Sequence, residues 1–234
     1  MRLTTNEKLV ARNTKIARYA TFAGLAILLG SLILSFNNNI VLAYGSLAVG
    51  FVLAYIGSIL ANRWIKEPRA DVALEKSLKG LDNRNHLYNY LLPVSHAMIT
   101  PTGILVFKIK SQDGSIAYEN GKWKRPFQLS RLIGGMGQEP LGNPLAELNA
   151  EIASLKNMLA DKLKNSALVP IDGYVVFSDP RVQLTLDDAT LPVVKAETLK
   201  DVLRKTKRGP VLSAAALEEI EQAFKEIADA KTAK

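Results

Sequence analysis

Two uncharged apolar runs, at residues 19–36 and 40–61, constrain this chain more than any other feature. An α-helix rises about 1.5 Å per residue, so each run is long enough to cross the roughly 30 Å hydrocarbon core of a bilayer. Only Asn37, Asn38 and Asn39 separate the runs, which leaves no room for a domain between them. We therefore predict a transmembrane hairpin that has the lipid bilayer as its partner.

Two other structures would also contain apolar runs of this kind. A secretory signal would explain the first run, but the second run follows at once and no A-x-A-like cleavage site lies between them. A buried pair of soluble helices would explain both runs, but neither run has the polar face that a soluble helix shows. The length and uniform apolarity of the runs favour the hairpin.

Small residues recur every four positions in the second run, at Ser46, Gly50, Ala54 and Ser58. Such a stripe lets another helix approach closely. We expect it to pack against the Ala20 and Gly24 side of the first run. The same stripe would also suit a homo-oligomer of this chain.

Basic residues flank the hairpin, while the link between its runs is neutral. Five precede the first run and three follow the second: Arg2, Lys8, Arg12, Lys15 and Arg18, then Arg63, Lys66 and Arg69. The positive-inside rule then places both termini in the cytoplasm of an integral cell-membrane protein. The formal net charge of the chain is +8, but residues 64–234 carry 24 basic and 21 acidic side chains, hence only +3. Most of the basic excess therefore lies next to the membrane.

The remaining residues predict one mixed α/β domain with helices packed on a central sheet. Helical spacing predicts a helix at 70–81, and apolar segments bounded by turns predict short strands at 87–92, 94–100, 104–110 and 115–118. A glycine-rich loop is expected at 127–142, then strands at 174–177 and 191–194, a helix at 197–205 and a last helix after Ser213. We divide the chain into a basic cytoplasmic tail (1–18), the hairpin (19–61), a juxtamembrane linker (62–69), the α/β domain (70–227) and a flexible tail (228–234).

The longest helix of this domain has a clear start. Asn143 is a good N-cap and Pro144 sits at the first helical position, where its missing N–H costs nothing. The apolar stripe that follows is expected to face the core: Leu145, Leu148, Ile152, Leu155, Leu159 and Leu163. We therefore expect Ile152→Asp to unfold the domain, and Glu151→Ala, one position round the helix, to be nearly silent.

The segment from Ser95 to Lys110, followed by Gly114 and Trp123, resembles the nuclease-related domain (NERD) family. That family is a branch of the PD-(D/E)XK restriction-endonuclease-like fold. Its pattern has an aspartate at the end of one strand, a glycine turn, and an apolar strand ending in Glu-x-Lys. A helix with a Gly-Glu pair precedes this pattern, and an Asn-Pro-x-x-Gln helix start follows it. Across residues 70–224 this chain keeps Glu75 and Asn143-Pro144, with Leu74 in place of the glycine and Glu147 in place of the glutamine.

The departures fall on the residues that hold metal in the family. Ser95 stands at the position of the metal-binding aspartate and Lys108 at that of the glutamate, so only Lys110 of the catalytic set remains. Mg²⁺ prefers carboxylate oxygens, and the ammonium of Lys108 would repel it. Four positions are therefore remnants of a site: Glu75, Ser95, Lys108 and Lys110. No catalytic residue, metal or cofactor is expected, and two histidines without a cysteine argue against a zinc site.

The resemblance implies a membrane-anchored, cytoplasmic nuclease-like domain that is catalytically inactive and acts as a binding or scaffold module. Nucleic acid is one candidate ligand, through phosphate contacts of five basic residues: Lys108, Lys110, Lys122, Lys124 and Arg125. Trp123 lies among these basic residues, but it also matches a structural tryptophan of the family, which favours a packing role over contact with nucleic acid. The alternative is an active membrane-tethered nuclease with Mg²⁺ and a rearranged site that recruits Asp113, Glu119 or Glu75. A third hypothesis is an anchored assembly partner with no ligand of its own.

Overall fold

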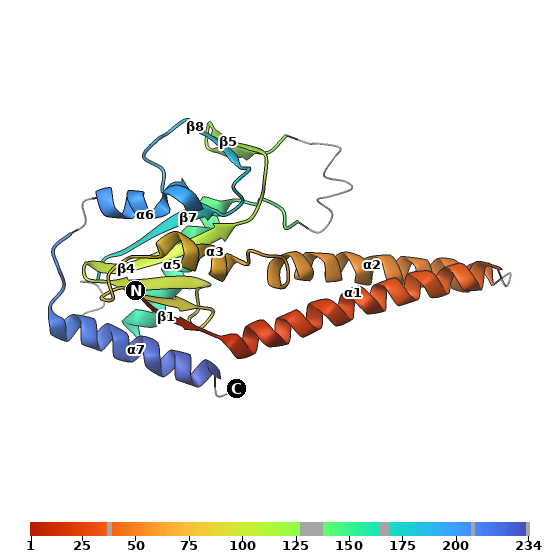
Figure 1. Ribbon diagram of the computed structural model, residues 1–234, viewed down its shortest axis with the longest axis horizontal. Coiled ribbons are helices and arrows are strands. Elements are labelled where there is room, and N and C mark those ends of the chain that lie inside the picture. The colour runs from red at the N-terminus through yellow and green to blue at the C-terminus, as the bar shows by residue number, and fades with distance from the viewer. Residues whose placement is uncertain (37–38, 127–137, 164–168, 207–208, 233–234) are drawn as a thin grey trace. The chain divides into compact units, whose positions relative to one another are not determined.

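The computed structural model describes residues 1–36, 39–126, 138–163, 169–206 and 209–232 (Figure 1). The chain divides into two compact units. One unit comprises Glu7–Arg69 together with Phe127–Pro140, and the other comprises Met1–Asn6, Ala70–Pro126 and Leu141–Lys234. Most of the glycine-rich loop predicted at 127–142 lies outside the described residues.

The first unit is built on two antiparallel helices, α1 (Glu7–Phe36) and α2 (Ile40–Trp64). Both are long and apolar enough, by length and composition, to cross a membrane. Small residues dominate the contact between the helices. The buried positions recur every seven residues: Val10, Ala17, Gly24 and Ser31 on α1, and Ala43, Gly50, Gly57 and Trp64 on α2. The two apolar N-terminal helices are thus confirmed.

The helix–helix contact corrects the predicted small-residue stripe. A Cβ atom on Gly24 would clash with the backbone nitrogen of Ala54, and one on Gly50 would lie 3.0 Å from the backbone nitrogen of Leu28. Gly50 and Ala54 therefore pack on α1, but the buried face repeats every seven residues, as in gently crossing helices. Ser46 and Ser58 lie at its margins and are only partly buried. A homo-oligomer through this stripe would have to displace α1.

The second unit contains a six-stranded sheet in the order β1-β2-β3-β4-β7-β9. Its strands are β1 (Arg2–Thr5), β2 (His86–Asn89), β3 (His96–Thr100), β4 (Gly103–Lys110), β7 (Ile171–Phe177) and β9 (Val193–Lys195). Strands β2, β3 and β4 overlap three of the four predicted short strands and pair antiparallel in chain order, whereas β1, β7 and β9 join by parallel pairing.

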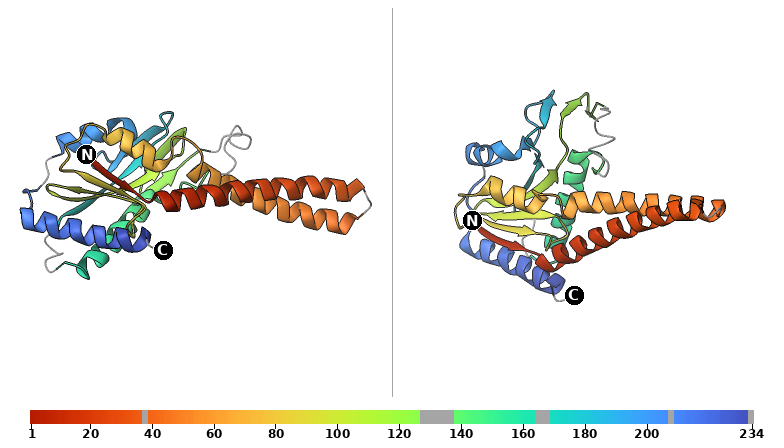
Figure 2. Two further views of the ribbon diagram at one scale, coloured as in Figure 1. Left: turned by 60° about the horizontal axis from the view of Figure 1, so that its bottom comes forward. Right: turned by 45° about the vertical axis from the view of Figure 1, so that its right-hand side comes forward.

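Two helices cover each face of the main sheet (Figures 1 and 2). On one face, α3 (Ala70–Leu78) and α6 (Ala196–Lys205) pack leucines against Phe107. On the other, α5 (Pro144–Ala160) and α7 (Ala214–Thr232) pack against the neighbouring Val106. Successive side chains of a strand point to opposite faces, so β4 contributes to both cores. The predicted mixed α/β domain is confirmed.

A second sheet of three strands, in the order β6-β5-β8, adds a feature that the sequence predicted only in part. It contains β5 (Ser115–Glu119), β6 (Lys122–Lys124) and β8 (Gln183–Leu186), and only β5 was expected. The indole of Trp123 lies 5.0 Å from the ring of Tyr118 and 6.1 Å from that of Phe177, centroid to centroid. Trp123 therefore packs between the small sheet and β7.

The start of the chain differs most from the prediction, because residues 1–18 are not a tail. Strand β1 is the edge strand of the main sheet, where the backbone N–H of Arg2 donates to the carbonyl of Asn85 at 2.8 Å. Asn6 follows β1 and its N–H donates to the carbonyl of Asn89 at 3.1 Å. Helix α1 then begins at Glu7 and carries four of the five basic residues that precede the apolar run, while Arg2 lies in β1. The α/β unit also extends beyond residue 227, since α7 continues to Thr232.

Helix α5 begins as the sequence predicts. The side chain of Asn143 accepts a hydrogen bond from the N–H of Ala146 at 3.2 Å, and Pro144 occupies the first turn. Leu148, Leu155 and Leu159 are buried on the expected face. The carboxylates of the site described next, Glu147 and Glu151, border this buried face and lie against β4.

Candidate functional site

The strand β4 and the helix α5 bring two lysines and two glutamates together. Lys108 Nζ lies 2.9 Å from Glu151 Oε1 and 3.0 Å from Glu147 Oε2. Lys110 Nζ lies 2.9 Å from Glu147 Oε1 and 3.0 Å from its Oε2. Residues two apart on a strand share a face, as do residues four apart on a helix, so each element presents a matched pair. We call these four residues the lysine–glutamate cluster.

Backbone groups from two further segments complete the cluster. The backbone N–H of Ser95, just before β3, donates to Glu151 Oε2 at 3.3 Å. Lys110 Nζ also donates to the carbonyl of Leu141 at 2.9 Å. The next residue, Gly142, has φ +63°, and a Cβ atom there would lie 2.6 Å from Glu147 Oε1. Glycine at this position therefore lets the chain pass close to the carboxylate.

The cluster is largely shielded from water. The side chain of Lys110 is 6% exposed, that of Glu151 16%, that of Lys108 22% and that of Glu147 36%. Burial alone would lower the pKa of Lys108, but hydrogen bonds and attraction from Glu151 and Glu147 raise it overall. Burial would likewise raise the pKa of Glu147, but hydrogen bonds from Lys110 and Lys108 hold it below its usual value. Lys108 and Glu147 are thus charged near neutral pH and stabilise each other's charge.

The donor set does not fit Mg²⁺, the ion that the sequence resemblance associates with this site. All four carboxylate oxygens of Glu147 and Glu151 accept hydrogen bonds from Lys108, Lys110 or Ser95. A divalent ion would have to break these bonds and lie beside two ammonium groups. In the described part of the chain, no three His, Cys, Asp or Glu side chains gather into a group that could hold a metal.

The carboxylates suggested for a rearranged site lie elsewhere. Asp113 pairs with Arg125 at 2.8 Å and with Arg181 at 3.2 Å. Glu119 pairs with Lys124 at 2.7 Å on the small sheet. Glu75 is exposed on α3, which covers the face of the main sheet opposite α5. The structure therefore brings none of the three into the cluster.

The five basic residues suggested for phosphate contacts fall in two places. Lys108 and Lys110 are bound to glutamates in the cluster. Lys122, Lys124 and Arg125 belong to β6 and the residue after it, where Lys124 and Arg125 are paired with Glu119 and Asp113. Four of the five cations already have acidic partners, so they do not form one open cationic groove.

Glu147 and Glu151 are the two site residues that were not predicted from the sequence. The expectation that Glu151→Ala would be nearly silent treated this side chain as solvated, but it contacts both Lys108 and Ser95. A signal was present in the sequence. Glu147 and Glu151 are four apart on one helix, and Lys108 and Lys110 are two apart on one strand. That pattern indicates matched charges once the strand and the helix are placed against each other.

No curated protein and no solved structure matches this chain. Residues 63–178, however, match the family model of the nuclease-related domain, NERD. This range contains β4, α5 and the whole lysine–glutamate cluster. Residues 63–178 are therefore similar to the nuclease-related domain, as the resemblance in the sequence predicts.

Proposed function

We propose that this protein is a membrane-anchored nuclease-related protein whose domain has a restriction-endonuclease-like fold and does not cleave nucleic acid. In this proposal it acts as a cytoplasmic binding or scaffold module. The lysine–glutamate cluster is the observation that carries the proposal. It lies where the family resemblance puts the metal-binding carboxylates, with Ser95 and Lys108 in their places.

The chemistry of phosphodiester hydrolysis supports an inactive site. A bound metal must polarise the phosphate and lower the pKa of the attacking water. Lys110 alone can stabilise the negative charge that develops on the phosphate, but it cannot generate hydroxide from water near neutral pH. The cluster instead uses its charges to join α5 to β4, which keeps the frame of the site without its metal ligands.

The pairing within the cluster also argues against nucleic acid as its ligand. A phosphate group would have to displace Glu147 or Glu151 from the lysines, and it would then lie beside these carboxylates. Nucleic-acid binding draws most of its affinity from unpaired cations that release counterions. We therefore favour a protein partner for the module.

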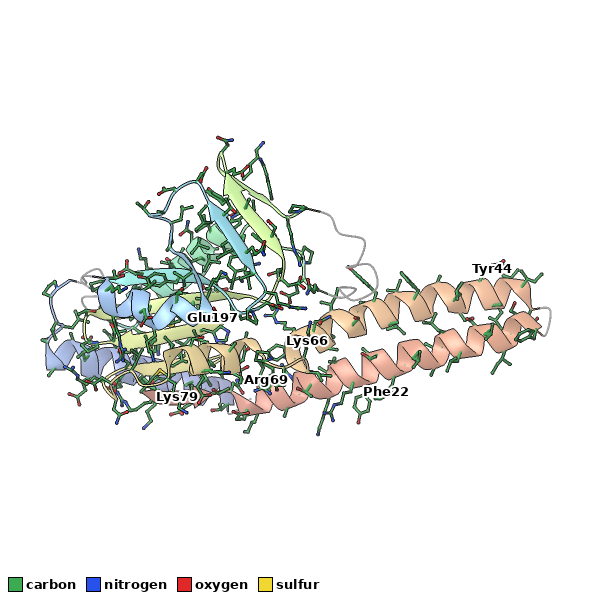
Figure 3. All side chains as sticks on the ribbon, turned by 45° about the horizontal axis from the view of Figure 1, so that its top comes forward. Phe22, Tyr44, Lys66, Arg69, Lys79 and Glu197 are labelled. Carbon is green, nitrogen blue, oxygen red and sulfur yellow. The ribbon has the colours of Figure 1, made fainter. Side chains whose placement is uncertain are left out.

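The edge strand β1 supports the membrane hairpin. Strand β1 pairs with β2, so residues 2–5 and 86–89 lie on the same side of any membrane. Either both apolar helices cross or neither does, and removal of the first run as a signal peptide would also remove this strand. Exposed aromatic side chains favour crossing: Phe22 is 68% and Tyr44 69% exposed, and both point away from the helix–helix contact (Figure 3).

A restored metal site tests the proposal. The assay needs full-length protein in detergent, because a fragment that starts after the hairpin lacks β1. We expect the unmodified protein neither to bind Mn²⁺ in calorimetry nor to cleave DNA or RNA with Mg²⁺ or Mn²⁺. Ser95→Asp combined with Lys108→Glu adds carboxylates at both metal positions and should gain Mn²⁺ binding.

The control variant combines Ser213→Asp with Lys205→Glu, the same two changes at exposed positions outside the cluster. It should not gain Mn²⁺ binding. Metal-dependent cleavage by the unmodified protein, abolished by Glu147→Gln or Glu151→Gln, would contradict the proposal and establish an active nuclease.

A further inference from the structure

We infer that the end of the helical hairpin near Asn6 carries a basic collar that binds the headgroups of anionic phospholipids. We define the collar as Lys8, Arg12, Lys15 and Arg18 on α1, with Arg63 and Lys66 at the end of α2. The inference rests on the proposed membrane anchor and adds the lipid class that the anchor selects.

Basic residues of the two helices lie at the same height along the hairpin. Contacts between the helices include Thr14 with Trp64, Thr21 with Gly57, Gly24 with Ala54, and Leu28 with Gly50. In each of these four pairs the two residue numbers add to 78, so a residue on α1 is nearly level with its complement on α2. Lys15 is thus level with Arg63. Basic side chains from both helices lie at the same height, immediately outside the apolar runs.

The basic side chains of α1 share one face of the helix. With 3.6 residues per turn, Lys8, Arg12, Lys15 and Arg18 occupy one side of α1, opposite Val10 and Ala17. Val10 and Ala17 are buried, while the four basic side chains are exposed. The stripe therefore faces away from α2 and is open to its surroundings.

Along this face of α1, the type of side chain changes in a fixed order. Directly after Arg18 come Tyr19 and Phe22, which are 72% and 68% exposed, and then Leu25 and Leu29. A change from basic to aromatic to aliphatic side chains is the order met on passing from headgroups into hydrocarbon. From Arg12 to Arg18 the helix rises about 9 Å, close to the depth of one headgroup layer.

The charge at this level is strongly positive. Described acidic side chains of the same unit are Glu7, Glu67 and Glu139, and Glu139 pairs with Arg63 at 3.1 Å with both groups about half exposed. The remaining excess of cations matches the negative headgroups of a cytoplasmic leaflet. Each basic residue near such a surface adds roughly 1 kcal/mol, or about fivefold in binding.

The test counts the lipids that full-length protein retains from vesicles of phosphatidylcholine mixed with phosphatidylglycerol, by native mass spectrometry. We expect phosphatidylglycerol to be enriched over phosphatidylcholine. The variant Arg12→Gln/Lys15→Gln/Arg18→Gln should lose this enrichment by roughly tenfold or more. The control Lys79→Gln/Arg204→Gln/Lys205→Gln removes the same charge from exposed positions of the α/β unit and should keep it.

Carbonate extraction of the same vesicles tests the membrane anchor separately from the lipid selectivity of the collar. A protein that resists extraction but retains both lipids equally would overturn the collar and leave the anchor standing. Equal loss of enrichment in the collar variant and in the control would also overturn it, because total charge would then decide. A protein released by carbonate would overturn the anchor itself.

Discussion

Glu151 accepts hydrogen bonds from Lys108 Nζ and from the backbone N–H of Ser95, so one carboxylate ties α5 to β4 and to the residue before β3. Truncation of Glu151 to alanine would leave the partly buried ammonium of Lys108 with one acceptor fewer. It would also remove the acceptor of the Ser95 N–H. We expect Glu151→Ala to lower the free energy of unfolding by about 1–3 kcal/mol. Urea denaturation of the full-length protein in detergent, followed by circular dichroism, measures this change.

A second glutamate provides the control at the residue scale. Glu226 pairs with Lys162 at 3.2 Å, but both side chains are about half exposed. Exposed pairs contribute little, so Glu226→Ala should change the stability by less than about 0.5 kcal/mol. Equal losses for Glu151→Ala and Glu226→Ala would show that the lysine–glutamate cluster does not stabilise the domain.

At the scale of elements, the contact between α1 and α2 depends on close approach at glycine. A Cβ atom on Gly24 would meet the backbone of Ala54, whereas one on Gly30 would have nothing within 4 Å. Alanine is a better helix former than glycine, so Gly30→Ala should be neutral or mildly stabilising. Gly24→Ala should instead force the helices apart.

The chain has no cysteine, so a disulfide can report this separation. Cysteines at Ala17 and Ala61, which are level in the hairpin, should cross-link on mild oxidation. We expect Gly24→Ala to slow this cross-linking several-fold and Gly30→Ala to leave its rate unchanged. The helix contact would be refuted if both variants cross-linked at the rate of the parent.

At the scale of the whole molecule, the sequence of the α/β unit is interrupted by the hairpin, because β1 precedes α1 and α3 follows α2. We expect single cysteines at Asn39 and Lys79 to lie on opposite sides of the membrane, with Lys79 in the cytoplasm. An impermeant thiol reagent on intact cells should label position 39 but not position 79. Permeabilised cells, in which both positions should react, provide the control, and the reverse pattern in intact cells would invert the orientation.

Several features of this protein follow from the sequence by itself. The two apolar helices, the Asn143-Pro144 start of α5 and the meander of β2, β3 and β4 depend on residues within a few positions of one another. Hydrophobic periodicity, capping and short turns are local properties, so a single sequence contains them. The family resemblance, now matched at residues 63–178, came from such a local pattern of strands and turns.

The edge strand, the partners in the cluster and the seven-residue repeat of the hairpin contact depend on packing between distant parts of the chain. The pair Thr5 and Asn89 is separated by 84 positions, and Lys108 and Glu151 by 43. A parallel edge strand carries no turn signal, and a charged side chain does not reveal its partner until strand and helix are packed. Residues 1–18 therefore resembled a tail, and Glu151 a solvated residue, because their interactions are made across the fold and not along the chain.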